Sequence, residues 1–349
     1  MRKIACGLLL LALAGLGAVG KERDAAEWVE AQGGTVSRDA SGATRVDLGF
    51  TGVTDDGLET LLLLPHLTSL DLSLARITDI GMERLKGLPE VRDLNLYYVE
   101  HISDIAMAQM RGWKNLERLS LRGCDITDAG LKHVAALTGL KSLDISFTLV
   151  TNNGLDSLSA LTHLEDLALG GNKISGVGLP VLKSLPALRR LSLNGTQRRN
   201  TEFWTPVVTD FDMGALAALT QLQELDLGGA KITDLGAGKL AALGELRSLN
   251  LSRTQVSGKG LESLARLPKL EKLSLWKDGQ VDDAGAAYLA GMHRLDTLDL
   301  SETRMTDVGL WRLETMPGLH HLYLEGTRVT AAGVEQFRRA NPGCKVYYQ

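Results

Sequence analysis

One short pattern of apolar and polar positions recurs along almost the whole chain. Leucine alternates with polar residues as L-x-x-L-x-L, for example over residues 67–72 and 222–227. Alternation of this kind predicts a short strand with one buried face. The last apolar residue of each copy recurs every 24 or 25 residues, with one longer step of 34. These residues are Leu48, Leu72, Leu96, Leu121, Ile145, Leu169, Leu193, Leu227, Leu251, Leu275, Leu300 and Leu324.

A second pattern follows many of the strands and predicts a helix. Thr-Asp-x-Gly-Leu stands, for example, at residues 127–131 and 306–310. We expect the Thr or Asp to cap the first helical turn by accepting bonds from its free N–H groups. Leu131, Val134 and Leu137 follow at helical spacing and would face the strand. Because one such unit cannot bury its apolar side alone, the twelve copies predict a stack of units that shares one thin core.

These units resemble the leucine-rich repeat family, and more narrowly its cysteine-containing subclass and secreted repeat proteins of environmental bacteria. That subclass reads L-x-x-L-x-L-x-x-C/T-x-I-T-D-x-x-L. Its C/T position is filled here by Thr51, Cys124, Thr148, Thr196, Thr254, Thr303 and Thr327, whereas Ala75, Asn172 and Ala230 depart from the pattern. The resemblance implies an α/β fold: a right-handed solenoid, or horseshoe, with parallel strands on its concave face and helices on its convex face. It implies no single activity.

The first 20 residues have the features of a secretory signal peptide. Arg2 and Lys3 precede an apolar run, and Ala18-Val19-Gly20 has the small residues of a cleavage site. The run is short for a membrane span, which needs about 20 residues, although a retained anchor stays open as the alternative. We therefore expect an exported protein, located in the periplasm, the cell envelope or outside the cell.

The remaining chain divides into a repeat region with a cap at each end, because both ends of a stack need a cover. At the N-terminus we expect an amphipathic helix over 22–32, stopped by Gly33-Gly34, and a strand over 35–38. After Phe337 the tail predicts a truncated last strand. The expected organisation is a signal peptide at 1–20, an N-terminal cap at 21–42, repeats at 43–340 with an insertion at 197–206, and a C-terminal cap at 341–349.

Composition narrows the class of protein. The length of 349 residues would allow two or three ordinary domains, but the repeats account for the mature chain as one. Aromatic residues make up only 5%, which suits a thin core. A balance of 38 basic against 42 acidic residues does not favour nucleic acid as the main partner. Three cysteines exclude a disulfide-dense scaffold, and we expect Cys124 and Cys344 to be free and buried.

Several of the few aromatic residues stand before, between or just after the strand leucines, where side chains face the concave surface. They are Phe50, Tyr97, Tyr98, Phe147, Trp276 and Tyr323. Aromatic side chains make good binding anchors because they bury a large area at low entropic cost. They are therefore predicted to bind a partner. The alternative is that the rings stack along the sheet and stabilise it.

The single long step between repeats marks an insertion at the end of a strand. It contains Arg198 and Arg199, which would pair with an anionic group, and Phe203 and Trp204, which would fill a pocket. Loops carried on a rigid scaffold often hold function, so partner contact is one interpretation. The other is a loop whose rings pack on its own neighbours.

A column of aspartates lies between the strand leucines. Its members are Asp47, Asp71, Asp144, Asp226 and Asp299. Carboxylates on adjacent strands, about 4.8 Å apart, repel one another and would attract a cation or a basic partner. A solvated face is the simpler interpretation. No calcium-loop pattern accompanies the column, and no metal or cofactor is expected.

Catalytic motifs are missing from the sequence: no zinc-protease pattern, no nucleophile elbow and no phosphate loop occurs in a suitable context. The protein is thus not expected to be an enzyme. The favoured hypothesis is a secreted, non-catalytic scaffold that binds a protein, peptide or glycan ligand through its concave face. A host-directed effector, resembling repeats attached to F-box modules of ubiquitin ligases, and a structural envelope component are the alternatives.

Overall fold

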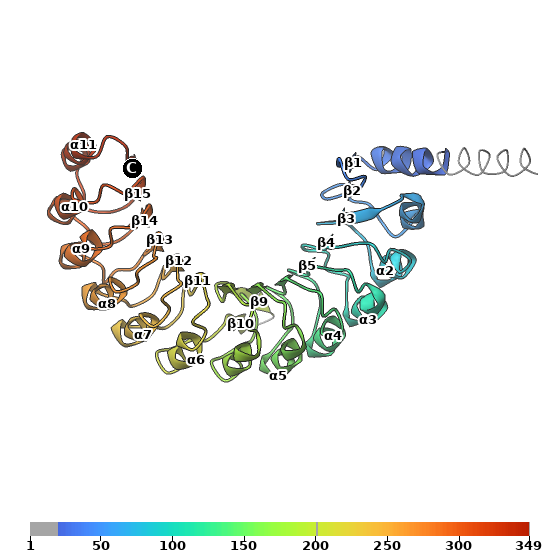
Figure 1. The fold of residues 1–349 in the computed structure, drawn as a ribbon, viewed down its shortest axis with the longest axis horizontal. Coiled ribbons are helices and arrows are strands. Elements are labelled where there is room, and N and C mark those ends of the chain that lie inside the picture. The colour runs from blue at the N-terminus through green and yellow to red at the C-terminus, as the bar shows by residue number, and fades with distance from the viewer. Residues whose placement is uncertain (1–19, 200–201, 349) are drawn as a thin grey trace, which may run out of the picture. The chain divides into compact units, whose positions relative to one another are not determined.

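The computed structural model describes residues 20–199 and 202–348, so most of the predicted signal peptide lies outside the described residues. The chain forms two compact units, Met1–Leu149 and Val150–Gln349. In each unit, short strands line one side and helices line the other (Figure 1). No described helix is long and apolar enough to cross a bilayer.

The first unit begins with a helix over 20–31 and continues as a sheet with helical segments between its strands. Its strands are β1 (Thr35–Arg38), β2 (Thr44–Asp47), β3 (Leu67–Asp71), β4 (Asp93–Asn95), β5 (Arg118–Ser120) and β6 (Ser142–Asp144). Its helices are η1 (Leu58–Leu63), α2 (Asp79–Leu85), α3 (Asp104–Gln109), η2 (Met110–Gly112) and α4 (Asp128–Val134). β1 is antiparallel to β2, and β2 to β6 are parallel in chain order.

The second unit repeats this arrangement. Its helices are α5 (Asn152–Leu155), η3 (Asp156–Ala160), η4 (Leu179–Ser184), α6 (Met213–Ala217), α7 (Asp234–Leu240), α8 (Gly258–Leu264), α9 (Asp283–Ala290), α10 (Asp307–Leu313) and α11 (Ala331–Ala340). Its parallel strands are β7 (Asp166–Ala168), β8 (Arg190–Ser192), β11 (Glu224–Asp226), β12 (Ser248–Asn250), β13 (Lys272–Ser274), β14 (Thr297–Asp299), β15 (His321–Tyr323) and β16 (Lys345–Tyr347).

The strand register confirms the predicted repeat. Leu94 of β4 pairs with Leu119 of β5, which pairs with Leu143 of β6. These leucines are at most 2% exposed, because each points inward against the helix of its own repeat. The result is a thin core of stacked leucines between parallel strands and outer helices. The predicted α/β solenoid, with strands and helices on opposite sides, is thereby confirmed.

Further elements precede the first repeat and follow the last one. At the N-terminus, Ala25 and Val29 of the first helix are fully buried, and β1 covers the edge of β2. At the C-terminus, β16 adds a last parallel strand to β15. Cys124 and Cys344 are free and buried, as predicted.

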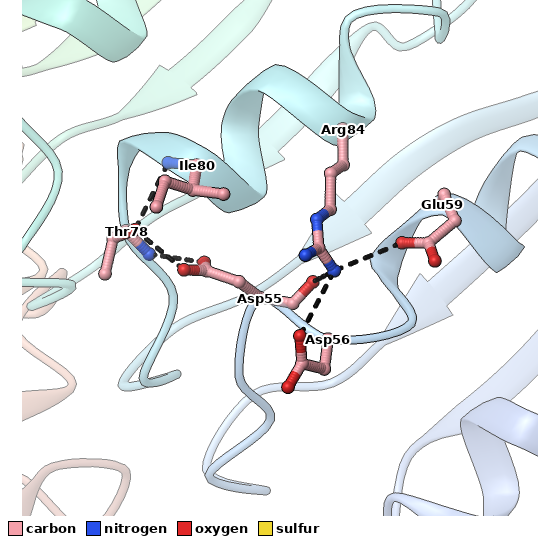
Figure 2. Close-up of polar contacts among 6 residues, drawn as sticks. All are labelled: Asp55, Asp56, Glu59, Thr78, Ile80 and Arg84. Carbon is pink, nitrogen blue, oxygen red and sulfur yellow. Dashed lines mark hydrogen bonds and ion pairs between the residues drawn. The ribbon is translucent and has the colours of Figure 1, made fainter.

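A bidentate hydrogen bond joins the helix start of one repeat to that of the next. The Thr78 hydroxyl accepts a bond from the Ile80 N–H and so caps α2, as the sequence predicted. Its own N–H and hydroxyl both donate to the Asp55 carboxylate of the preceding repeat, each at 2.7 Å (Figure 2). Asp55 therefore accepts the hydrogen bonds of Thr78, the residue that caps the helix of the next repeat. We call this bond the Asp–Thr bridge.

The Asp–Thr bridge recurs, with Ser in place of Thr at some steps. In the first unit it joins Asp79 to Ser103 and Asp104 to Thr127. In the second it joins Asp210 to Thr233, Asp234 to Ser257, Asp283 to Thr306 and Asp307 to Thr330. Each bridge couples one repeat to the next through charge-assisted bonds.

The bridge also explains the glycine of Thr-Asp-x-Gly. A Cβ on Gly236 would lie 2.5 Å from the Asp210 carboxylate, and one on Gly260 would lie 2.6 Å from that of Asp234. Any other residue would push the aspartate away from the cap that it serves. Where Gly258 replaces the aspartate, no bridge reaches the next repeat, and Asp282 instead caps its own helix α9.

Asp278 occupies the position that Cys or Thr holds in other repeats. It is fully buried and accepts a bond from the Thr254 hydroxyl at 2.8 Å. Burial raises the pKa of Asp278 to about 6, because the charged carboxylate is poorly solvated there. The repeat pattern did not predict a buried acid at this position.

Replacing Asp55 by Ala should lower the free energy of unfolding by about 2 kcal/mol, because two half-buried donors of the cap lose their charged acceptor. Chemical denaturation measures the change. Asp56→Ala is the matched control: the Asp56 side chain is 92% exposed and only approaches Arg84 at 3.4 Å (Figure 2), so its loss should cost less than about 0.5 kcal/mol. Equal effects of the two variants would contradict the role of the bridge.

Replacing Asp278 by Asn should remove a pH dependence of stability. The pKa of Asp278 is about 6 in the fold and about 4 in the unfolded chain. Its contribution is therefore fully present below pH 4 and is lost as the pH rises through 6, a change of about 2–3 kcal/mol. Denaturation at several pH values should show the parent losing this stability relative to Asp278→Asn. Parallel curves would contradict the assignment.

Candidate functional site

Three aromatic rings and one guanidinium gather at the strand ends of the first unit. The ring centroids of Tyr97 and Tyr98 lie 4.7 Å apart edge to face, and those of Tyr98 and Phe147 lie 6.5 Å apart. The Arg122 guanidinium lies 4.3 Å from the Phe147 centroid and 5.9 Å from that of Tyr97. We call these four residues the aromatic–arginine cluster. The structure thus brings three of the predicted anchors together.

The cluster depends on a left-handed turn that ends each strand. In every repeat, the residue two places after the last strand leucine has a positive φ, as Tyr98 (φ 51°) and Phe147 (φ 59°) do. This backbone conformation is costly for residues other than glycine unless nearby hydrogen bonds stabilise it. Asn95 and Asp144, three residues earlier, supply such bonds because their side-chain oxygens accept the N–H groups of Tyr97 and Ser146.

The same turns explain the column of aspartates. Asp71 accepts the Ser73 N–H at 2.8 Å and the Asn95 side-chain N–H at 2.8 Å. Asp226 accepts the Gly228 N–H, and burial raises its pKa. The carboxylates therefore lie at the ends of the strands and stabilise the turns that follow. Among the residues that the structure describes, no group of three His, Cys, Asp or Glu side chains is placed to hold a metal ion.

A hollow in the strand face adjoins the cluster. Its volume is about 480 Å³, and Tyr97 lies at its border. The polar side chains around it are Ser69, Asp71, Asp93, Asn95, Arg118, Ser120, Ser142 and Asp144. Arg118 is already paired with Asp93 at 2.9 Å. The hollow therefore presents both hydrogen-bond donors and acceptors beside the aromatic rings.

The other predicted anchors lie apart from the cluster. Phe50 stands at the first left-handed turn with 78% of its side chain exposed. In the second unit, Trp276 lies 5.5 Å below the Lys277 ammonium. Tyr323 stacks on Tyr347 of the last strand, with centroids 4.3 Å apart and planes 6° apart. Tyr323 therefore fits the alternative of a stabilising stack.

The insertion forms a two-stranded hairpin of β9 (Gln197–Arg199) and β10 (Glu202–Trp204). Lys173 lies 5.6 Å from the Trp204 ring, and the Gln197 amide donates to the Gly171 carbonyl at 2.6 Å, which holds the hairpin against the preceding repeat. Phe203 is 72% exposed. The backbone of Arg198 and Arg199 lies in β9, and their side chains lie outside the described part of the structure.

Two features were missed by reasoning from the sequence. Arg122 belongs to the cluster, and its place directly after Leu121 corresponds to that of Tyr97 after Leu96. The third position of Thr-Asp-x-Gly carries exposed apolar side chains on neighbouring repeats: Val177 is 83%, Phe211 94% and Leu235 75% exposed. Alignment of the repeats by register would have revealed both.

Comparison with known proteins identifies the family. The leucine rich repeat family model matches residues 46–126, 138–197 and 220–278, more than half of the chain. The chain belongs to the leucine-rich repeat family. No curated protein matches its sequence.

Solved leucine-rich repeat structures are similar to this one. An internalin (inlF) from Listeria monocytogenes is 22% identical, with a TM-score of 0.61 over 87% of this chain and 86% of that one. A leucine-rich repeat protein from Leptospira interrogans is 16% identical, with a TM-score of 0.45 over 86% and 94%. An internalin C2 from Listeria monocytogenes is 22% identical, with a TM-score of 0.39 over 70% and 84%. At such identities the likeness concerns the fold alone.

Replacing Gly123 by Ala should destabilise the repeat and displace the Tyr98 ring. Gly123 has a φ of 79°, and a Cβ there would lie 2.7 Å from that ring. Gly229→Ala is the matched control, since Gly229 has the same φ but nothing within 4 Å of the added carbon. The control should cost about 1 kcal/mol from backbone strain, and Gly123→Ala at least about 1 kcal/mol more. Denaturation midpoints measure this, and equal losses would contradict the packing of Tyr98 on Gly123.

Proposed function

We propose that the protein is an exported, non-catalytic scaffold that binds a segment of another protein through the strand face of its leucine-rich repeats. The observation that carries this proposal is the aromatic–arginine cluster beside the hollow of the first unit. Tyrosine, phenylalanine and arginine are residue types that contribute strongly to binding energy. Their concentration on one face of a chain with only 5% aromatic residues favours recognition over core packing.

The scaffold favours binding because it holds these groups in place before a partner arrives. The backbone of Tyr98 is fixed by a hydrogen bond from its N–H to the Arg122 carbonyl at 2.6 Å, and the ring rests on Gly123. Groups that are already ordered lose little entropy on binding. A rigid sheet carrying ordered rings therefore supports a stable complex without a deep pocket.

Export is supported by the signal-peptide pattern of residues 1–20. The two described cysteines are compatible with an oxidising compartment, because burial raises the pKa of Cys124 to about 12 and that of Cys344 to about 11. Both thiols therefore stay protonated, and a protonated thiol is a poor nucleophile for disulfide exchange.

The test is affinity capture with the purified protein, followed by measurement of Kd for each captured partner. Tyr97→Ala combined with Phe147→Ala should weaken binding by about tenfold or more. A second variant, Trp276→Ala, tests the strand face of the second unit in the same way.

The matched control is Trp311→Ala, because Trp311 is 46% exposed but belongs to helix α10 on the opposite side of its unit. It should change Kd by less than about twofold. Circular dichroism confirms that every variant is folded. A partner that binds all strand-face variants as tightly as the parent would contradict the proposed surface.

A further inference from the structure

Arg122 has no acidic partner in the described part of the chain, unlike two arginines that lie in or beside the neighbouring strands. Arg118 pairs with Asp93 at 2.9 Å, and Arg92 pairs with Glu117 at 3.1 Å. Among the residues that the structure describes, Arg122 makes no ion pair, and its Nε is buried without a hydrogen-bond acceptor. Because that Nε is buried, a ligand at the surface would be bound by the two Nη groups of the guanidinium.

The Arg122 guanidinium lies over two aromatic rings. It lies 4.3 Å from the Phe147 centroid and 5.9 Å from that of Tyr97. Stacking on rings stabilises the cation through its planar faces. The two Nη groups of a guanidinium that lies over a ring can still donate hydrogen bonds, and their fork geometry matches two oxygens in one plane.

We propose that Arg122 binds a carboxylate of the partner protein, as an anchor of the aromatic–arginine cluster. This inference rests on the proposed function, because it names the chemistry recognised at that same surface. The incoming carboxylate accepts bonds from the edge of the guanidinium, while aliphatic or aromatic parts of the partner contact Tyr97 and Phe147. The neighbouring hollow, with Asp71, Asn95 and Asp144 around it, receives polar groups of the adjoining residues.

A carboxylate suits this place better than a phosphate. Asp71, Asp93 and Asp144 line the hollow that Tyr97 borders. Their negative charges disfavour a dianion more strongly than a monoanion. One guanidinium near such a hollow therefore favours a singly charged ligand group, either an acidic side chain or the terminal carboxylate of a chain.

The test uses a displayed library of random linear peptides, selected on the purified protein. Selected peptides should share Asp, Glu or a free terminal carboxylate at one position. Their affinity should fall at least about tenfold on Arg122→Gln, and less on Arg122→Lys, which keeps the charge but not the planar fork. Arg111→Gln is the charge-matched control, since Arg111 is exposed in η2 of the same unit.

The peptides are then changed in two arms. Replacing Asp or Glu by its amide tests a side-chain source, and amidating the C-terminus tests a terminal source. In the arm that holds the carboxylate, affinity should fall as much as on Arg122→Gln, and the two changes combined should lose no more than either alone. Tighter binding of a phosphoserine version would overturn the assignment to a carboxylate.

The two proposals fail in different ways. Peptides that need Tyr97 and Phe147 but bind Arg122→Gln as tightly as the parent would overturn the carboxylate site and leave the proposed function standing. Peptides that bind without any need for Tyr97 and Phe147, or the selection of no peptide at all, would overturn both. The thermal midpoint of Arg122→Gln, measured beside that of Arg111→Gln, separates lost binding from lost folding.

Discussion

The Asp–Thr bridge is the constraint on which the rest of each unit depends. A repeat of this size cannot bury its apolar face by itself, so its stability comes largely from its two neighbours. Leucine contacts are non-directional and would tolerate some sliding between repeats. The bridge is directional: Asp104, for example, must meet both the N–H and the hydroxyl of Thr127, at 2.8 and 2.6 Å. Where it occurs, it therefore reinforces at the helix starts the register that strand pairing gives the stacked leucines. That register persists between β12 and β13, where Gly258 replaces the aspartate and no bridge forms.

The fixed register in turn decides what the strand face carries. In each repeat the strand is followed by a residue of positive φ two places after its last leucine or isoleucine, and six of the seven non-glycine residues at this position follow an Asp or Asn three places earlier. Four of the five glycines at the same position follow another residue type. The hydrogen bond accepted by the Asp or Asn side chain stabilises the turn. The residue of positive φ can therefore be an aromatic one instead of glycine. Phe50, Tyr98 and Phe147 occupy such positions.

Most of the architecture could be predicted from the sequence because it is periodic. The strands, the Thr caps, the end strand β1 and the truncated β16 all follow from apolar spacing and local chemistry. The second role of the aspartate could not be predicted locally, because the partner of Asp55 is 23 residues away and belongs to the next repeat. The hairpin of the insertion and the buried Asp278 depart from the period, so the repeat pattern predicted neither.

The candidate site was predictable only in part, for a related reason. Spacing placed Tyr97, Tyr98 and Phe147 near one surface, but it could not show that Arg122 lies against two of their rings. That contact depends on side-chain orientation across three repeats. Natural proteins usually satisfy buried polar groups, and the exceptions concentrate where function requires them. The bridges satisfy helix caps in repeat after repeat, whereas the Nε of Arg122, like Trp113 Nε1 and Gln109 Oε1, is left without a hydrogen-bond partner. A chain that stabilises its stack so consistently, yet keeps this cation unpaired among aromatic rings, has the features expected of a surface selected for binding.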